Sequence, residues 1–587
     1  MTPPAPIAAR RQSAPTALES VLTRCAVYPL IAAALLWFVP GNGIPVYLLH
    51  HQDGITVVVS AAMLLALVAA LRRGAFRLAP RPVDGRTIPV LVIATVFALT
   101  LAGTWLVFGD HALSRDEIMA NFDADILRTG RLMARAVPGW IDYTDALIPL
   151  FRHEVPGNVA WVANYLPGNA LLRALADLTA GREVTGPLLA ALAAVALFRI
   201  ARRLWPDTPG SALLALTLLV TAPQFLVTAM TPYAMTAHLA LNLVWLWCHL
   251  RDDRRGVAGA LAVGFLATGL HQLIFHPLFV LPFLVELAID RRWARAATYA
   301  AGYAAIGLFW ASYWPIAFAV TGIAAEGGGA GGGLAQVAHV AVVLASRFDL
   351  GSLVVMLFNL VRFATWQHIL LIPLALLAWP AIRRGEGIAR PLAGGLALTL
   401  AAMIVLMPEQ GNGWGYRYVH GLLGSLCLLA VHGWRRAQTM VDVARLRWAM
   451  LAATLGTVLV LLPLDAAFAY RLVRPYRAAA AMILRAGTPI VLVDPAHSLT
   501  AQDLVRNAPD LRNRPLILDA GALDERQTRR LCARYPIALF DRTQAAAAGI
   551  PGVPTYDGLT RRALVALGCR VANPPGWSAA PQPSQHR

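Results

Sequence analysis

Long apolar runs separated by short arginine clusters occupy most of the first 470 residues, and this alternation constrains the fold more than any other feature. A helix needs roughly 20 mostly apolar residues to cross the hydrocarbon core of a bilayer, which is about 30 Å thick. Only 14% of the 587 residues are charged, whereas a soluble chain carries roughly 25%. The sequence therefore predicts a polytopic α-helical membrane protein with about 13 transmembrane helices.

Arginine clusters at the ends of these runs predict the orientation, because positively charged loops stay on the cytoplasmic side. Outward spans are predicted at 25–40, 88–108 and 448–468, and inward spans at 55–71 and 184–200. A single orientation, with a cytoplasmic N-terminus and residues from 471 onward outside, places every cluster in the cytoplasm. The clusters are Arg10/Arg11/Arg24, Arg72/Arg73, Arg199/Arg202/Arg203, Arg251/Arg254/Arg255, Arg291/Arg292/Arg295, Arg383/Arg384 and Arg435/Arg436.

Residues 319–366 are the ambiguous part of this topology. A glycine-rich loop at 326–333 is followed by two semi-apolar stretches, 337–346 and 351–361. If one of them crossed the bilayer alone, the arginine pair at 383–384 would lie outside, against the charge rule. We therefore expect both stretches to lie on, or dip into, the outer membrane surface.

The pattern of apolar and polar residues changes beyond residue 470. Three short apolar runs, 489–494, 515–519 and 537–541, each end in aspartate, and polar helical segments separate them, as in a small α/β unit. We predict a disordered cytoplasmic N-terminus over 1–24, a multi-span domain over 25–470 with a large outside loop at 109–183, a small extracytoplasmic α/β domain over 471–573, and a disordered tail over 574–587.

Net charge and cysteine content exclude several function classes. The formal charge of +18 comes from arginines at the ends of apolar runs, so we read it as a topology signal and expect no nucleic-acid partner. None of the five cysteines shows metal-ligand spacing such as C-x-x-C. Cys532 and Cys569 share the C-terminal domain, and they could form a disulfide if that domain faces an oxidising compartment.

The outside loop at 109–183 holds an unusual density of polar side chains. Asp116 and Glu117 follow the third predicted span and begin an amphipathic helix. They could be solvated loop residues, or carboxylates at the water–lipid boundary that deprotonate an acceptor hydroxyl or hold a divalent cation. Two carboxylates are too few ligands to argue a cation site, so the metal is left unknown.

The order of four motifs resembles a known family. The first outside loop contains Ser-Arg-Asp-Glu at 114–117, Asn-Phe-Asp-Ala-Asp-Ile-Leu at 121–127 and Thr-Gly-Arg-Leu at 129–132. Residues 163–172 resemble a Tyr-Pro-Pro-Gly-x-x-Leu-Leu stretch with Leu166 in place of the first proline. An Arg-rich span end at 197–204 and a shortened Gly-Trp-x-x-Gly-x-Arg-Tyr loop at 413–418 follow. Together they resemble the GT-C superfamily of polyprenyl-phosphate-sugar-dependent glycosyltransferases, which includes bacterial relatives of protein mannosyltransferases and aminoarabinose transferases.

The resemblance implies an integral enzyme of the bacterial cytoplasmic membrane. Its donor would be a polyprenyl-phosphate-linked sugar, its acceptor a lipid, glycan or protein, and membrane lipids would surround it. Asp116 would be the general base, and Arg417 would hold the phosphate leaving group through its guanidinium fork. The remaining candidates are Glu117 for catalysis and Tyr416, Tyr418, Tyr165, His271, His276 and Glu409 for substrate binding, with Gln410 and His238 less specific.

Structural roles without any substrate contact remain open for the substrate-binding candidates. Tyr416 and Tyr418 could anchor the chain at the headgroup level, and His271 and His276 could be hydrogen-bonded turn residues. The five-residue spacing of these histidines disfavours a shared metal site on one helix face.

Two other functions compete with the transferase. A transporter or flippase would place charges near mid-membrane, whereas these spans are nearly free of charge by sequence. A polysaccharide polymerase or ligase would not be expected to carry the early Asp-Glu loop.

Overall fold

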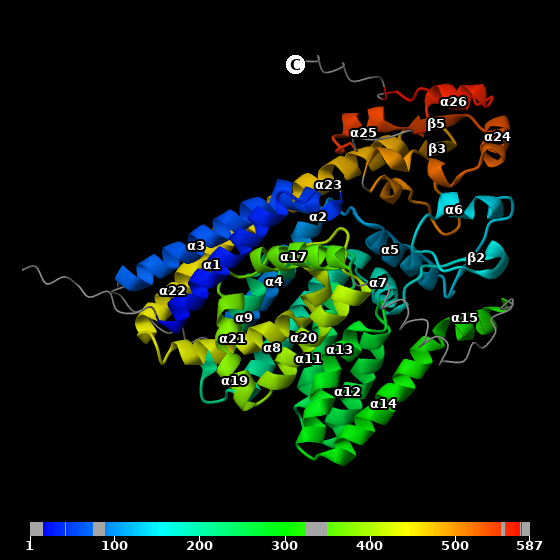
Figure 1. Ribbon diagram of the computed structural model, residues 1–587. Coiled ribbons are helices and arrows are strands. Elements are labelled where there is room, and N and C mark those ends of the chain that lie inside the picture. Colours follow the sequence, from blue (N-terminus) through cyan, green and yellow to red (C-terminus); the bar gives the residue numbers. More distant parts are fainter. Residues whose placement is uncertain are drawn as a thin grey trace, which may run out of the picture.

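The computed structural model describes residues 16–41, 43–73, 88–323, 349–498, 500–552, 558–575 and 577. Helices form one elongated bundle, and a C-terminal unit that contains the only parallel sheet of the described residues lies at one end of it (Figure 1). Four predictions fall outside these residues, wholly or in part: the disordered N-terminus over 1–24, the glycine-rich loop at 326–333, the surface stretch at 337–346 and the disordered tail over 574–587.

Six helical segments of the described residues are long and apolar enough to cross a membrane. Two further pairs of helices pass the same test jointly but are bent at a short break, so the number rises to eight if each pair is one span. The predicted count of about 13 is therefore not confirmed. The reason is physical: several apolar runs form short helices broken at prolines and glycines. The six segments are Ala17–Leu36, Ile44–Arg73, Pro89–Leu106, Arg182–Leu204, Ala389–Leu406 and Val443–Leu484.

The first helix begins earlier than the sequence suggested. Helix α1 (Ala17–Leu36) starts within the segment that was predicted to be disordered. A capping box explains the start, because Thr16 and Glu19 exchange hydrogen bonds between each side chain and the other's backbone N–H. Helix α1 packs against α3 (Gly54–Arg73) and α17 (Leu350–Thr365).

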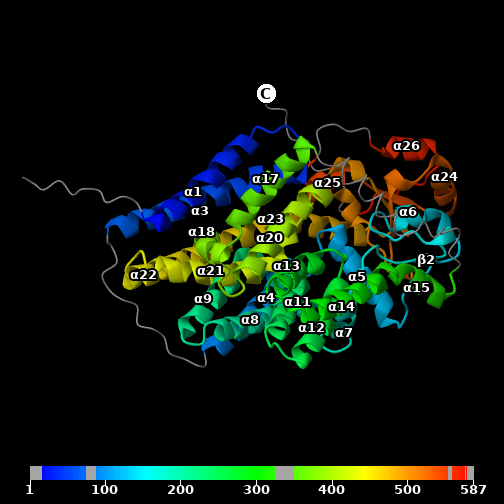
Figure 2. The ribbon, with the colours of Figure 1, turned by 60° about the horizontal axis from the view of Figure 1, so that its bottom comes forward.

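The remaining bundle helices pack against one another, and Figure 2 shows the bundle from a second side. Their bounds are α2 Ile44–Leu48, α4 Ile88–Leu106, α8 Thr185–Leu204, α9 Pro209–Val220, α10 Pro223–Ala229, α11 Met235–His249, α12 Arg254–Thr268, α13 Phe275–Ile289, α14 Trp293–Ala311, α15 Tyr313–Thr321, α18 Leu371–Leu377, α19 Trp379–Arg384, α20 Ala389–Leu406, α21 Leu423–Ala437, α22 Val443–Gly456 and α23 Leu462–Leu484.

Helices α18 and α21 pack closely together, and one glycine makes this possible. A Cβ at Gly433 would lie 1.8 Å from the carbonyl oxygen of Leu374. Small residues at such positions let helix backbones meet inside a membrane, where packing rather than burial from water drives association. The second half of the chain is thereby fixed against the first, because α21 also packs on α9.

The loop between α4 and α8 is folded over the end of the bundle. It contains α5 (Arg115–Arg128), α6 (Thr144–Leu147), α7 (Gly168–Asp177) and a two-stranded antiparallel ribbon of β1 (Ala134–Arg135) and β2 (Ala160–Trp161). Helix α5 packs on α7, and its apolar face contributes Met119, Phe122 and Ile126 to a second core.

The C-terminal unit supplies the rest of that second core. Each of the three apolar runs that end in aspartate contains a strand: β3 (Ile490–Val493), β4 (Leu516–Asp519) and β5 (Ile537–Phe540), parallel in the order β4-β3-β5. The aspartates at 494, 519 and 541 accept backbone N–H groups of the turns that follow. Helices α24 (Glu525–Arg534), α25 (Arg542–Ala548) and α26 (Arg561–Ala566) complete the unit.

Cys532 and Cys569 are joined by a disulfide in this unit. Cys532 belongs to α24, and Cys569 follows α26, so the bond ties two helices of the α/β unit together.

We expect thiol labelling of the denatured, unreduced protein to modify three cysteines, and labelling after reduction to modify five. Cys25, Cys248 and Cys427 are the free thiols and serve as the internal control. Mass spectrometry of the labelled chain counts the modified sites. Labelling of five cysteines without reductant would contradict the disulfide.

Candidate functional site

Asp116 lies in the first turn of α5 and is nearly buried, with 10% of its side chain exposed. One carboxylate oxygen accepts a hydrogen bond from the Tyr165 hydroxyl, and the other is 2.5 Å from Nη1 of Arg417. Arg417 lies 301 positions further along the chain. The structure therefore brings together the early loop, the Tyr-Leu-Pro-Gly stretch and the late Gly-Trp loop at one carboxylate.

Aromatic rings surround the two charges. The Arg417 guanidinium lies 5.2 Å from the ring centre of Tyr418 and 5.3 Å from that of Tyr233. Both distances suit cation–π attraction, which strengthens when water is excluded. The ring of His271 stacks on Tyr165 at 4.0 Å, and its Nε2 is 4.0 Å from Asp116. Tyr233 is a member of this site that the sequence reasoning missed, because no motif marked it.

Burial and neighbouring charges shift the pKa values of Asp116 and His271 in opposite directions. Burial alone would raise the pKa of Asp116, but the Arg417 guanidinium, His271 and the hydrogen bond from Tyr165 hold that pKa below its usual value. For His271, burial lowers the pKa to about 4, although Asp116 opposes this shift. The site therefore contains a carboxylate, a guanidinium and a neutral imidazole at neutral pH.

Glu117 does not join this cluster, although it follows Asp116 directly. Its Oε2 accepts hydrogen bonds from the backbone N–H groups of Leu113 and Ser114 and from the Ser114 hydroxyl. This arrangement is a helix cap, which holds the first turn of α5 in place. Burial raises the pKa of Glu117 to about 7, despite those hydrogen bonds.

Side chains behind the Gly-Trp loop fix its backbone. Gln410 donates to the carbonyl of Gly415 and accepts from the backbone N–H of Arg417. Gln224 donates to the carbonyl of Tyr416, and the Tyr233 hydroxyl donates to the carbonyl of Asn412. Gln410 therefore supports the loop from within. Glu409 has an exposed side chain, and its main-chain carbonyl accepts a hydrogen bond from the Tyr418 hydroxyl.

A buried arginine from the bundle also holds this loop. Arg362 on α17 donates to the Gly413 carbonyl at 2.5 Å, and its Nε lies 3.7 Å from Asp53. Asp53 also accepts a hydrogen bond from Trp366, and the fully buried Asp465 interacts electrostatically with both charges. Of these three charges, only Asp465 lies in one of the spans predicted from the sequence, at 448–468, whereas Asp53 and Arg362 lie just outside the predicted segments 55–71 and 351–361.

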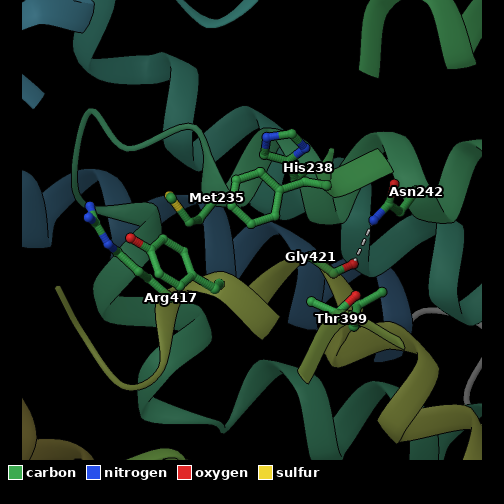
Figure 3. A pocket seen from close by; sticks show the side chains of 9 residues that line it. Met235, His238, Asn242, Thr399, Arg417 and Gly421 are labelled. Carbon is green, nitrogen blue, oxygen red and sulfur yellow. Dashed lines mark hydrogen bonds between the residues drawn. The ribbon is translucent and has the colours of Figure 1, made fainter. Parts of the chain in front are cut away.

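A small cavity lies on the bundle side of the same loop. It is lined by residues of α11, α13, α20 and the turn after Arg417, and Figure 3 shows Arg417 at one end with His238, Asn242 and Thr399 toward the other. Both ring nitrogens of His238, Oγ1 of Thr399 and Nε of Arg417 are buried and have no hydrogen-bond partner within the described residues. Buried polar groups rarely stay unpaired, so these atoms point to a ligand or water there.

Besides Glu409, two of the predicted substrate-binding residues, His276 and Tyr416, have side chains that make no hydrogen bond to Asp116 or Arg417 in the described part of the chain. His276 is buried in the bundle between Asn242 at 2.7 Å and Tyr303 at 2.8 Å, so both its ring nitrogens have partners. The Tyr416 ring is fully buried beside Tyr418, and its hydroxyl has no partner in the described part of the chain.

The donor set does not fit a divalent cation at Asp116. Its two oxygens already face a guanidinium and a phenol, and Glu117 is engaged in the helix cap. Hard cations prefer several oxygen ligands and no neighbouring positive charge. No group of three or more histidine, cysteine, aspartate or glutamate side chains among the described residues could hold a metal ion.

No family model and no curated protein matches the chain. Two solved structures of ArnT from Cupriavidus metallidurans are similar, each with a TM-score of 0.46. The apo form is 14% identical over 71% of this chain and 84% of its own, and the form bound to undecaprenyl phosphate is 13% identical over 72% and 86%. Likeness at this level assigns neither family nor function.

The raised pKa of Glu117 predicts a pH-dependent stability. Because the folded-state pKa of about 7 exceeds the ordinary 4.5, the folded protein binds the extra proton between these values, and stability falls as pH rises through this window. The loss reaches about 3 kcal/mol above pH 7. Glu117→Gln keeps an acceptor for the cap, so its melting temperature relative to wild type should rise from pH 5 to pH 8. A constant difference across this range would contradict the assignment.

Proposed function

We propose that the protein is an integral membrane glycosyltransferase that moves a sugar from a polyprenyl-phosphate donor to an acceptor on the outer face of the cytoplasmic membrane. The observation that carries the proposal is the nearly buried pair of Asp116 and Arg417. A lone carboxylate suits proton acceptance, and a guanidinium suits a phosphate leaving group. The four ordered motifs support the same assignment.

Asp116 is the general base in this mechanism. The acceptor hydroxyl attacks the anomeric carbon of the donor sugar, and its proton passes to the Asp116 carboxylate. The new glycosidic bond forms while the bond between the anomeric carbon and the phosphate oxygen breaks. Direct displacement of this kind inverts the anomeric configuration.

Arg417 stabilises the charge that develops on the lipid phosphate. Cationic donors aimed at a leaving group act strongly where water is excluded, and the Arg417 side chain is only 9% exposed. Its Nε has no partner among the described residues, and the unpaired groups of His238 and Thr399 line the adjoining cavity. A phosphate or sugar hydroxyls would satisfy these groups.

The ion pair also gives the reaction an order. With Arg417 bound to it, Asp116 is a weak base because its pKa is held down. An incoming phosphate competes for the guanidinium, which weakens its hold on Asp116 and restores the basicity of the carboxylate. Donor binding therefore prepares the base before the acceptor reacts.

Tyr165 and His271 orient the carboxylate in this scheme. The Tyr165 hydroxyl bonds one oxygen of Asp116, and the neutral His271 ring supports Tyr165 by stacking. Tyr418 shields the guanidinium from water. The sugar and the acceptor, which could be a lipid, a glycan or a protein, would be identified by comparing masses of envelope glycolipids and glycoproteins between a deletion strain and its parent.

The mechanism requires Asp116 and Arg417 to face outside, where the donor headgroup emerges. We therefore expect a cytoplasmic N-terminus and an extracytoplasmic C-terminal unit, as the arginine clusters predict. Reporter fusions after Arg73, Arg203, Arg255, Arg384 and Arg436 should report cytoplasm, and fusions after Gly109 and Pro475 should report the outside. An outside signal at Arg384 would give the Gly-Trp loop the wrong side for this reaction.

Substitutions at the pair should separate donor binding from chemistry. Asp116→Asn removes the proton acceptor, so product formation in a complemented deletion strain should fall roughly 10²–10⁴-fold. Because Arg417 then loses its competing carboxylate, the purified variant should bind undecaprenyl phosphate at least as tightly as wild type. Arg417→Ala should lose both binding and product, and Arg417→Lys should lose a smaller part because it keeps the charge without the fork.

Membrane abundance of each variant, measured in the same cells, is the control for folding. Near-normal product from Asp116→Asn would reject its role as base and direct attention to Glu117 and Asp123. Tolerance of substitution at all three carboxylates would favour the transporter alternative.

A further inference from the structure

The C-terminal α/β unit contacts the helix that carries Asp116, next to that residue. The side chain of Arg115, which is 4% exposed, leaves the first turn of α5 and enters the C-terminal unit. Its Nη1 donates to the Val505 carbonyl at 2.9 Å, and its Nη2 donates to the Gln502 carbonyl. The guanidinium also faces Asp503, with 3.6 Å between Nε and the nearest carboxylate oxygen.

A second arginine makes the reverse connection. Arg506 of the C-terminal unit donates to the Ala112 carbonyl at 2.6 Å and contacts the His111 ring. The two arginines thus tie the segment just before Asp116 to the C-terminal unit at two points, residues 111–112 and residue 115. The shared core strengthens the contact, because Met119 and Phe122 of α5 pack in one cluster with Leu516 and Leu518 of β4.

We propose that the C-terminal unit sets the position of the Asp116 carboxylate, with Arg115 as the positioning residue; this inference rests on the proposed role of Asp116 as base. Asp116 follows Arg115 directly, so a shift of the Arg115 backbone moves the carboxylate relative to Arg417. A displacement of 1 Å can cost on the order of 10²-fold in rate. The planar fork of an arginine suits two carbonyls at once, whereas a lysine ammonium offers no such fork.

The buried pair of Arg115 and Asp503 fixes the geometry of this contact more than it adds to the free energy of unfolding. Burial lowers the pKa of Arg115 and raises that of Asp503 to about 6, so desolvation opposes both charges. Such a pair contributes little net stability, but removing one member leaves a buried charge uncompensated. The arrangement therefore suits a fixed docking geometry between α5 and the C-terminal unit.

The test compares Arg115→Lys in two backgrounds of the full-length protein. In the wild-type background, product formation in the complemented deletion strain should fall about 10- to 100-fold at equal membrane abundance. In the Asp116→Asn background, the same change should have no further effect, because Arg115 acts through Asp116. Binding of undecaprenyl phosphate to purified Arg115→Lys should stay within threefold of wild type.

A matched control breaks a peripheral contact of the same interface. Arg530 and Asp142 are about half or more exposed and 3.5 Å apart, so Arg530→Gln should leave product formation unchanged. If Arg115→Lys does not accumulate in the membrane, Asp503→Asn, which nearly keeps the side-chain shape, replaces it in the test. Its product formation is then compared in the wild-type and Asp116→Asn backgrounds, with the same expected result.

Normal product from Arg115→Lys would overturn the inference, as would an equal loss in both backgrounds. Full activity of Asp116→Asn would reject the base assignment itself, whatever the Arg115 variants show.

Discussion

The ion pair between Asp116 and Arg417 is the constraint on which the rest of the site depends. Two nearly buried charges from segments 301 positions apart lie 2.5 Å from each other, and removing either one leaves the other without its compensating charge. The fold must therefore bring the segment after α4 and the segment before α21 to the same end of the bundle. Close helix contacts such as that of α18 with α21 supply the rigid frame for this.

The segment that carries each member of the pair is held by a further arginine, whose guanidinium donates hydrogen bonds to main-chain carbonyls. Arg115 fixes the start of α5 to the C-terminal unit, and Arg362 fixes Gly413 to the bundle. An aspartate lies near each of these guanidinium groups: Asp503 near Arg115 and Asp53 near Arg362. Because buried ion pairs add geometry more than stability, this repeated device suits a site whose spacing matters.

Sequence patterns anticipated the parts of this structure that depend on local chemistry. Apolar runs located helices, runs ending in aspartate located the three strands, and motif order brought Asp116, Tyr165 and Arg417 into one hypothesis. The role of Glu117 was not predictable, since capping and catalytic carboxylates look alike in sequence. The contact between Arg115 and residues 502–505 has no local signal, because it joins segments about 390 positions apart. The predicted count of about 13 spans is not confirmed, because several apolar runs form short helices that are broken at prolines and glycines.

Buried charges inside the bundle are compatible with an enzyme and with a transporter, and the groups to which they bond distinguish the two functions. Asp53, Arg362 and Asp465 would suit an ion pathway if they lined one alone. Arg362 instead donates to Gly413, four positions before Arg417, and Trp366 beside it packs near Trp414 of the same loop. Arg362, with Asp53 beside it, therefore supports the Gly-Trp loop. The unpaired polar atoms of His238, Thr399 and Arg417 also line the cavity beside that loop, and this arrangement favours the proposed enzyme over the transporter.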